Sequence, residues 1–154
     1  MPALIDIAKA FLTSKGWVYD TSSEAAVLRL GFDGRGGRFP CYVECHEELG
    51  QLVFFCLRPG SVPAAQRPKV AEYLMRVNCR LNVGGFELNF DDGTVRFRSG
   101  IDVEGRGLDA VLLSHLALLS VATMDKFMPG IDAVLAGTAA QAALEALPLD
   151  PAED

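Results

Sequence analysis

Apolar and polar side chains alternate along two parts of the chain, and this alternation constrains the fold more than any other feature. Residues 25–32 and 39–46 alternate in the first part, and residues 86–90 and 94–103 alternate in the second. Successive side chains of a β-strand point to opposite faces, so the alternation predicts strands with one face in the core. Residues 51–57 are apolar on both faces, which is typical of a central strand.

Short polar segments separate these strands. Residues 33–37 are rich in glycine, residues 47–50 are polar, and Asp91-Asp92-Gly93 is a tight-turn sequence in which glycine supplies a positive φ. Strands joined by such turns pair in antiparallel fashion. Strands and helices are segregated along the chain, so the sequence predicts an α+β fold with an antiparallel sheet of about five strands. The expected order is α-βββ-α-ββ-α, with the helices packed on the sheet.

Apolar residues at helical spacing predict the helices. Residues 3–15 form the first helix, and residues 69–81 form a second helix that ends at Gly84-Gly85 in the manner of a left-handed cap. Residues 108–136 form the third helix. Two helical pieces are expected there, because Pro129-Gly130 interrupts the pattern.

The end of the chain is different in composition. Residues 138–147 are rich in alanine and predict a further helix, whereas residues 148–154 are acidic and are expected to form a flexible tail. The chain shows neither an internal repeat nor a linker. Residues 1–147 are therefore predicted to form a single domain of ordinary size.

The charge balance excludes some classes of partner. The chain has 14 Lys and Arg residues against 20 Asp and Glu residues, a net charge of −6, and no basic stripe. Neither a nucleic acid nor an anionic membrane is an expected partner. No export signal is visible, and the apolar stretches are shorter than the roughly 20 residues that span a bilayer. We therefore expect a cytoplasmic protein.

The cysteines are the first candidates for metal or catalytic chemistry. Cys41, Cys45, Cys56 and Cys79 all lie in apolar stretches, which predicts four buried thiols. On one strand Cys41 and Cys45 would lie about 13 Å apart, and His46 would point away from Cys45. This spacing does not suit a tetrahedral zinc site. We predict no metal and no cofactor.

The remaining candidates also favour structural roles. His115 lies between Leu112 and Leu119 on the apolar face of the predicted long helix, where a core or interface histidine is expected. Glu47-Glu48 and Asp91-Asp92 indicate solvated turns rather than carboxylate pairs. No catalytic residue is predicted. A redox sensor that uses the cysteines is an alternative, and it predicts fast alkylation of the native protein.

Two surfaces are candidates for binding another protein. The helix from Leu108 is apolar over more than one stripe, so one sheet face cannot cover it all. Either the C-terminal segment or a second copy of the chain covers the rest, and the second copy is the favoured expectation. Arg96 and Arg98 share the polar face of a strand, where they pair with Glu87 and Asn89 across the hairpin or hold an acidic partner. The predicted residues of the partner-binding or dimer surface are Val111, Leu113, Leu118, Val121, Arg96 and Arg98.

Several strings carry a resemblance to a known family. They are Phe39–Val43, Val62-Pro63 with Arg67, Val70–Asn78, Gly85–Leu88, Asp92–Arg98 and Met124–Ile131. Over roughly residues 25–137 the chain resembles the YbjN family of bacterial sensory transduction regulators, which have the fold of type III secretion chaperones. The resemblance implies a homodimer that holds an extended partner segment along its sheet and helix surfaces. It implies no catalytic residues.

Two functional hypotheses follow. The leading one is a non-enzymatic protein-binding module, chaperone-like or sensory and regulatory, which acts as a homodimer and holds a partner polypeptide. The alternative is a small-molecule-binding or enzymatic domain with a pocket between sheet and helices. For that alternative the polar candidates are His115, Tyr42, Arg96 and Arg98.

Overall fold

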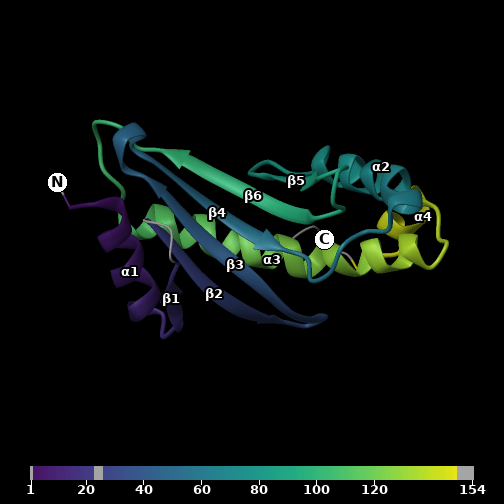
Figure 1. Ribbon diagram of the computed structural model, residues 1–154, viewed down its shortest axis with the longest axis horizontal. Helices are drawn as coiled ribbons and strands as arrows, with labels where there is room; N and C mark the ends of the chain where they lie inside the picture. The colour runs from purple at the N-terminus through teal and green to yellow at the C-terminus, as the bar shows by residue number, and fades with distance from the viewer. Residues whose placement is uncertain (1, 23–25, 149–154) are drawn as a thin grey trace.

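The computed structural model describes residues 2–22 and 26–148, which form an antiparallel sheet with helices packed against it (Figure 1). The strands are β1 (Tyr19–Thr21), β2 (Val27–Gly34), β3 (Gly37–His46), β4 (Gln51–Leu57), β5 (Gly85–Leu88) and β6 (Val95–Asp102). The helices are α1 (Leu4–Ser14), α2 (Arg67–Asn78), α3 (Ala110–Leu135) and α4 (Ala140–Glu145), with short 3₁₀ helices η1 (Glu47–Leu49) and η2 (Ala64–Gln66). The predicted α+β class is confirmed. The predicted tail lies outside the described residues from Leu149 onward.

The described sheet has six strands, all antiparallel, in the order β1-β2-β3-β4-β6-β5. The prediction of about five strands missed β1, because three residues are too few for alternation to be visible. Thr21 of this strand pairs with Leu28 of β2. The turn predicted at residues 91–93 does join β5 to β6, and Gly93 has the positive φ of 78° that such a turn favours.

The helices cover one face of the sheet, and α3 runs along its whole length (Figure 1). Inward side chains alternate with outward ones as predicted: Phe39, Cys41 and Val43 of β3 are fully or almost fully buried. The helix contacts β2, β4 and β6 across this core. In the described part of the chain no helix lies over the opposite face, which the figure turns toward the viewer.

The long helix α3 corrects two expectations. It continues for 26 residues through Pro129, where a break was predicted. The proline is exposed, and the helix continues although the carbonyl of Asp125 loses its helical hydrogen-bond partner. By length and composition α3 could also cross a membrane. From the sequence no such segment was expected, because the uninterrupted apolar stretches are too short. Half of its most apolar stretch is buried within the fold, as in the core helix of a globular domain.

Helix α2 packs against α3 immediately beside that proline. Tyr73 of α2 is fully buried, and its hydroxyl donates a hydrogen bond to the carbonyl of Phe127 at 2.7 Å. A Cβ atom on Gly130 would overlap the hydroxyl and ring of Tyr73. Gly130 therefore does not end the helix but permits the close approach of a second one.

Glu47 also differs from its predicted role in a solvated turn. Its carboxylate accepts hydrogen bonds from the backbone N–H groups of Leu4 at 3.0 Å and Ile5 at 2.9 Å. The first N–H groups of a helix have no partner within the helix, and negative charge is favourable there. Glu47 thus caps α1 from a position 43 residues away in the sequence.

Three of the four cysteines are buried as predicted, whereas Cys79 is exposed just after α2. Cys41 and Cys56 face each other on adjacent strands, with their sulfur atoms 3.7 Å apart. Burial raises the pKa of Cys45 to about 12, and it raises the pKa of Cys56 further still with help from the contact with Cys41. These thiols are protonated at neutral pH.

Replacing Gly130 with alanine is expected to lower the free energy of unfolding by about 1–3 kcal/mol, because the new methyl group overlaps Tyr73. Urea denaturation measures this loss. The matched control is Gly36→Ala in the β2–β3 turn, where a Cβ atom would meet its nearest neighbours at 3.9 Å. That variant should remain within about 0.5 kcal/mol of the wild type. Equal stability of both variants would contradict the described contact.

Alkylation of the native protein at pH 8 is expected to label Cys79 quickly and the other three cysteines at least about a hundredfold more slowly. The thiolate is the reactive form, so the raised pKa of Cys45 and Cys56 lowers their reactive fraction, and burial blocks access to all three thiols. Mass spectrometry over time counts the labels. The Cys79→Ser variant should label only slowly, and all four sites should react in denaturant. Fast native labelling at Cys41, Cys45 or Cys56 would favour the redox-sensor alternative.

Candidate functional site

The side of α3 that faces away from the sheet carries exposed apolar side chains. Val111 is 63% exposed, Leu112 41%, Leu118 43% and Leu119 42%. Their spacing of seven residues brings the two pairs onto one side of the helix, with His115 halfway between them. We call these five residues, together with Ala122, the outward face of α3. His115 is exposed there and does not lie in the core.

Two residues predicted for this surface are placed elsewhere. Leu113 is 1% exposed and Val121 is 3% exposed, so both belong to the core, although Val121 also lines the pocket described below. Leu113 lies on the same side of the helix as Leu116 and Ala117, which also pack inward. Of the four apolar residues predicted on this helix, Val111 and Leu118 lie on the outward face.

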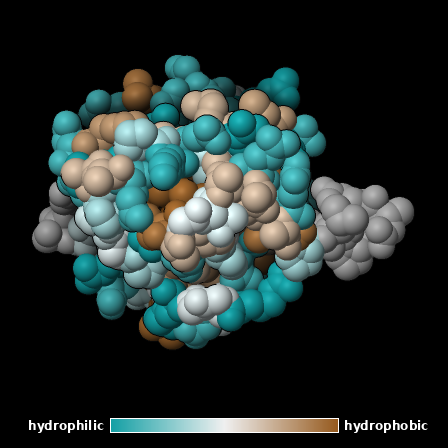
Figure 2. Space-filling model, turned by 90° about the vertical axis from the view of Figure 1, so that its right-hand side faces the viewer, coloured by the Kyte–Doolittle hydropathy of each residue, from teal (hydrophilic) through white to brown (hydrophobic). Residues whose placement is uncertain are grey.

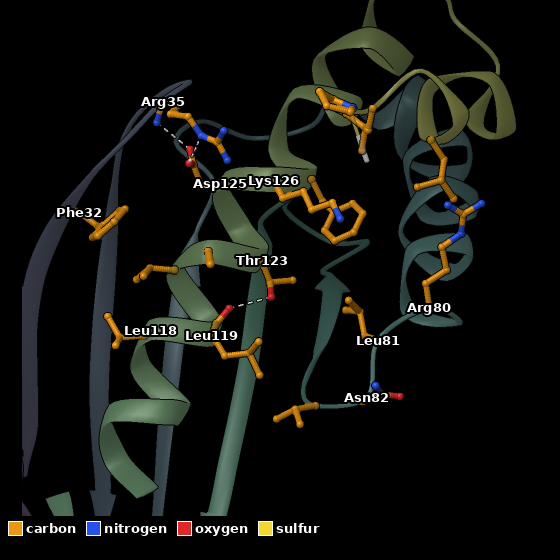
Figure 3. Close-up of a pocket in the computed structure, with 17 residues that line it drawn as sticks. Phe32, Arg35, Arg80, Leu81, Asn82, Leu118, Leu119, Thr123, Asp125 and Lys126 are labelled. Atoms are coloured by element: carbon orange, nitrogen blue, oxygen red, sulfur yellow. Dashed lines mark hydrogen bonds and ion pairs between the residues drawn. The ribbon is translucent and has the colours of Figure 1, made fainter. Parts of the chain in front are cut away.

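A cavity of about 830 Å³ adjoins the C-terminal half of this face, and we call it the α3 pocket. Figure 3 shows α3 between Phe32 on one side and the segment Arg80–Asn82 on the other. The apolar lining includes Phe32, Leu81, Val83, Leu118, Leu119, Val121, Ala122, Phe127, Leu144, Leu147 and Pro148. The charged lining consists of Arg35, Arg80, Asp125 and Lys126. At the end of the molecule formed by α2 and α4, hydrophobic residues are visible in hollows between polar ones (Figure 2).

An ion pair holds the β2–β3 turn against α3. The backbone N–H of Arg35 donates to Oδ1 of Asp125 at 2.8 Å, and Nε of Arg35 lies 3.3 Å from Oδ2 (Figure 3). A Cβ atom on Gly34 would overlap the Asp125 carboxylate, so glycine is needed at this contact. The Arg35–Asp125 pair forms one wall of the pocket, and the carboxylate of Asp125 is bound by Arg35.

The opposite wall depends on the end of α2. The helix ends at Asn78 and not at Leu81 as predicted, so residues 79–84 form a loop before β5. The Asn78 side chain donates to the carbonyl of Phe86 at 3.0 Å and accepts from its N–H at 2.8 Å. These two bonds fix both ends of the loop relative to each other, and the loop brings Arg80 and Leu81 to the pocket.

Arg96 and Arg98 lie on the sheet face away from α3. Both contact Glu87, as predicted: Nη2 of Arg96 is 2.8 Å from Oε2, and Nε of Arg98 is 2.6 Å from Oε1. The Arg96 guanidinium also lies 4.6 Å from the centre of the Phe55 ring. The structure therefore does not bring these arginines together with the outward face of α3.

The residues considered for metal or nucleophilic chemistry do not converge. Cys41, Cys45 and Cys56 are buried, whereas His46 has a half-exposed side chain that contacts Glu44 at 3.0 Å. Within residues 2–22 and 26–148, no three His, Cys, Asp or Glu side chains are grouped so that they could hold a metal ion. The arrangement offers an apolar surface and a cationic pocket.

The charged residues of the α3 pocket were missed by the sequence reasoning. Arg35 was interpreted only as part of a glycine-rich turn, and Arg80 as part of a helix. Asp125 and Lys126 could have been noticed, because they are the only charged residues between Ala110 and Asp132. A charged pair within an otherwise apolar helix indicates a place where that helix is not simply covered by core.

Three solved structures are similar to the chain, and the first two of them share its fold. YbjN from E. coli, described as "a putative transcription regulator", is 14% identical with a TM-score of 0.65, and the match covers 87% of this chain and 94% of that one. A chain of the ExsC–ExsE complex is 13% identical with a TM-score of 0.51, covering 82% and 93%. A chain of the HopA1–SchA chaperone–effector complex is 16% identical with a TM-score of 0.49, covering 76% and 85%. No curated protein sequence matches the chain.

A family model supplies the assignment. The model for YbjN, described as "Putative bacterial sensory transduction regulator", matches residues 5–133. This range includes every described strand and three of the four described helices up to the last turn of α3. The chain belongs to the YbjN family.

Proposed function

We propose that the protein is a non-enzymatic binding module, chaperone-like or regulatory, which holds a segment of a partner polypeptide in the α3 pocket. The observation that carries the proposal is the continuous apolar surface from Leu118 and Leu119 on the outward face into the pocket. Monomeric proteins seldom leave contiguous apolar surface of this kind uncovered unless it binds something. A helix face bordered by two walls suits an extended or helical segment with apolar anchors.

Likeness of fold supports the same class of function. The ExsC–ExsE structure is a complex of two proteins, and one of its chains has this fold. The family description, a sensory transduction regulator, fits a protein that acts by binding another protein.

The polar groups within the pocket favour binding over catalysis. The hydroxyl of Thr123 donates to the carbonyl of Leu119 at 2.7 Å, within the helix itself. The carboxylate of Asp125 accepts hydrogen bonds from Arg35. Both groups thus have structural partners, and neither is paired with a nucleophile as a general base would be.

Selection of short random peptides displayed on phage against the purified protein tests the proposal. Selected peptides are expected to be rich in apolar residues, and Leu119→Gln should weaken their binding by about tenfold or more through the loss of an apolar contact. Glutamine keeps the helix propensity, and Leu119 is already half-exposed, so folding should be unaffected.

The matched control is Met75→Gln, which changes an exposed apolar residue of α2 outside the pocket, 64% exposed against 42% for Leu119. Its peptide affinity, measured by fluorescence anisotropy, should equal that of the wild type. The proposal fails when no peptide is selected, or when Leu119→Gln and Met75→Gln bind equally well.

A homodimer is also part of the proposal. Val111 and Leu112 lie on the outward face beyond the α3 pocket, and they leave an apolar area that a second copy would cover. Light scattering after size-exclusion chromatography should give twice the mass of the chain at micromolar concentration. The double variant Val111→Gln with Leu112→Gln should shift this mass to that of the monomer, whereas Met75→Gln should not. A monomeric wild type would remove the homodimer from the proposal.

A further inference from the structure

The charged lining of the α3 pocket is opposite in sign to the rest of the molecule. Arg35, Arg80 and Lys126 contribute three positive charges, and Asp125 contributes one negative charge, which gives the pocket a net charge of +2. The whole chain carries −6, so the remainder of the molecule carries −8. A negatively charged segment is therefore attracted to the pocket, whereas the net charge of the rest of the molecule opposes its approach.

The cations of the pocket are not equally engaged. Arg35 is paired with Asp125, which neutralises both charges locally. Arg80 follows α2, and its backbone N–H bonds to the carbonyl of Val77. In the described part of the chain its guanidinium takes part in no hydrogen bond and no ion pair. An arginine in this state presents its fork of N–H donors to a ligand.

The position of Arg80 relative to the apolar lining determines which ligand fits. Arg80 is followed by Leu81 on the same wall, and Leu118 and Leu119 lie across the pocket from them (Figure 3). A carboxylate bound by the exposed guanidinium would thus stand near half-exposed apolar groups. Charge-assisted hydrogen bonds are stronger than neutral ones.

We propose that the α3 pocket selects partner segments in which an Asp or Glu side chain lies beside apolar anchors, with the carboxylate bound by Arg80. This inference rests on the proposed function and adds the chemistry of the partner to it. A basic segment would meet the positive pocket, and a purely apolar segment would leave Arg80 beside it without a partner. Both are disfavoured relative to an acidic segment.

The same phage selection tests the inference. Whether any peptide is selected tests the proposed function, and the amino-acid composition of the selected peptides tests the inference. Acidic residues should be enriched next to the apolar ones. A selected peptide and its amide version, with Asp→Asn or Glu→Gln, are then compared by fluorescence anisotropy. The acidic peptide should bind the wild type at least tenfold more tightly than the amide version. The Arg80→Glu variant should remove that preference.

The matched control is Arg76→Glu, one turn earlier on α2, where the arginine is paired with Glu72 and does not line the pocket. It should keep the preference for the acidic peptide. The preference should also decrease at high salt, since it is electrostatic.

The outcomes separate this inference from the proposed function. Peptides that need Leu119 but show no acidic preference would overturn the inference and leave the proposed function standing. The absence of any Leu119-dependent peptide would overturn both. Dodecanoate provides a further arm: thermal stabilisation by this free amphiphilic acid, with no binding of acidic peptides, would assign the pocket to a small carboxylic acid and overturn the inference.

Discussion

One helix has more apolar surface than one sheet face can cover, and the rest of the structure is arranged around that constraint. The sheet buries one side of α3, α1 contacts its N-terminal part, and α2 and α4 pack against its C-terminal part. The approach of α2 depends on Gly130, since a side chain there would overlap Tyr73. The side of α3 that no described element covers is the outward face. The α3 pocket adjoins the C-terminal half of that face.

The sheet could be predicted from the sequence because alternation is a local property with a period of two. The orientation of α3 could not be predicted in the same way. A helix with apolar residues on every side has no polar stripe to indicate which side faces solvent, so Leu113 and Val121 were expected on the surface and lie in the core. The walls of the α3 pocket could not be predicted either, because Arg35 and Asp125 are 90 residues apart and meet only through the tertiary fold.

Two groups of arginines illustrate how the surroundings decide what a charge can do. Arg96 and Arg98 share Glu87, and Arg96 also stacks on Phe55, so their charges are largely satisfied within the protein. Arg80 has no such partner among the described residues, although nothing in its local sequence distinguishes it. The sequence singled out the first group because two arginines alternate on one strand. Among these three arginines of the described structure, Arg80 is the one whose guanidinium is available to a ligand.

The outer strands of the sheet are short: β1 has three residues and β5 has four. An edge strand presents unpaired backbone groups on which a further strand, from any chain, can add, and longer edges favour uncontrolled aggregation. The exposed apolar side chains of the outward face lie on a helix and not on these edge strands. A helix face binds through side chains alone and gives no template for a growing fibril. The exposed apolar surface is thus separate from the strand edges, where a further strand could add.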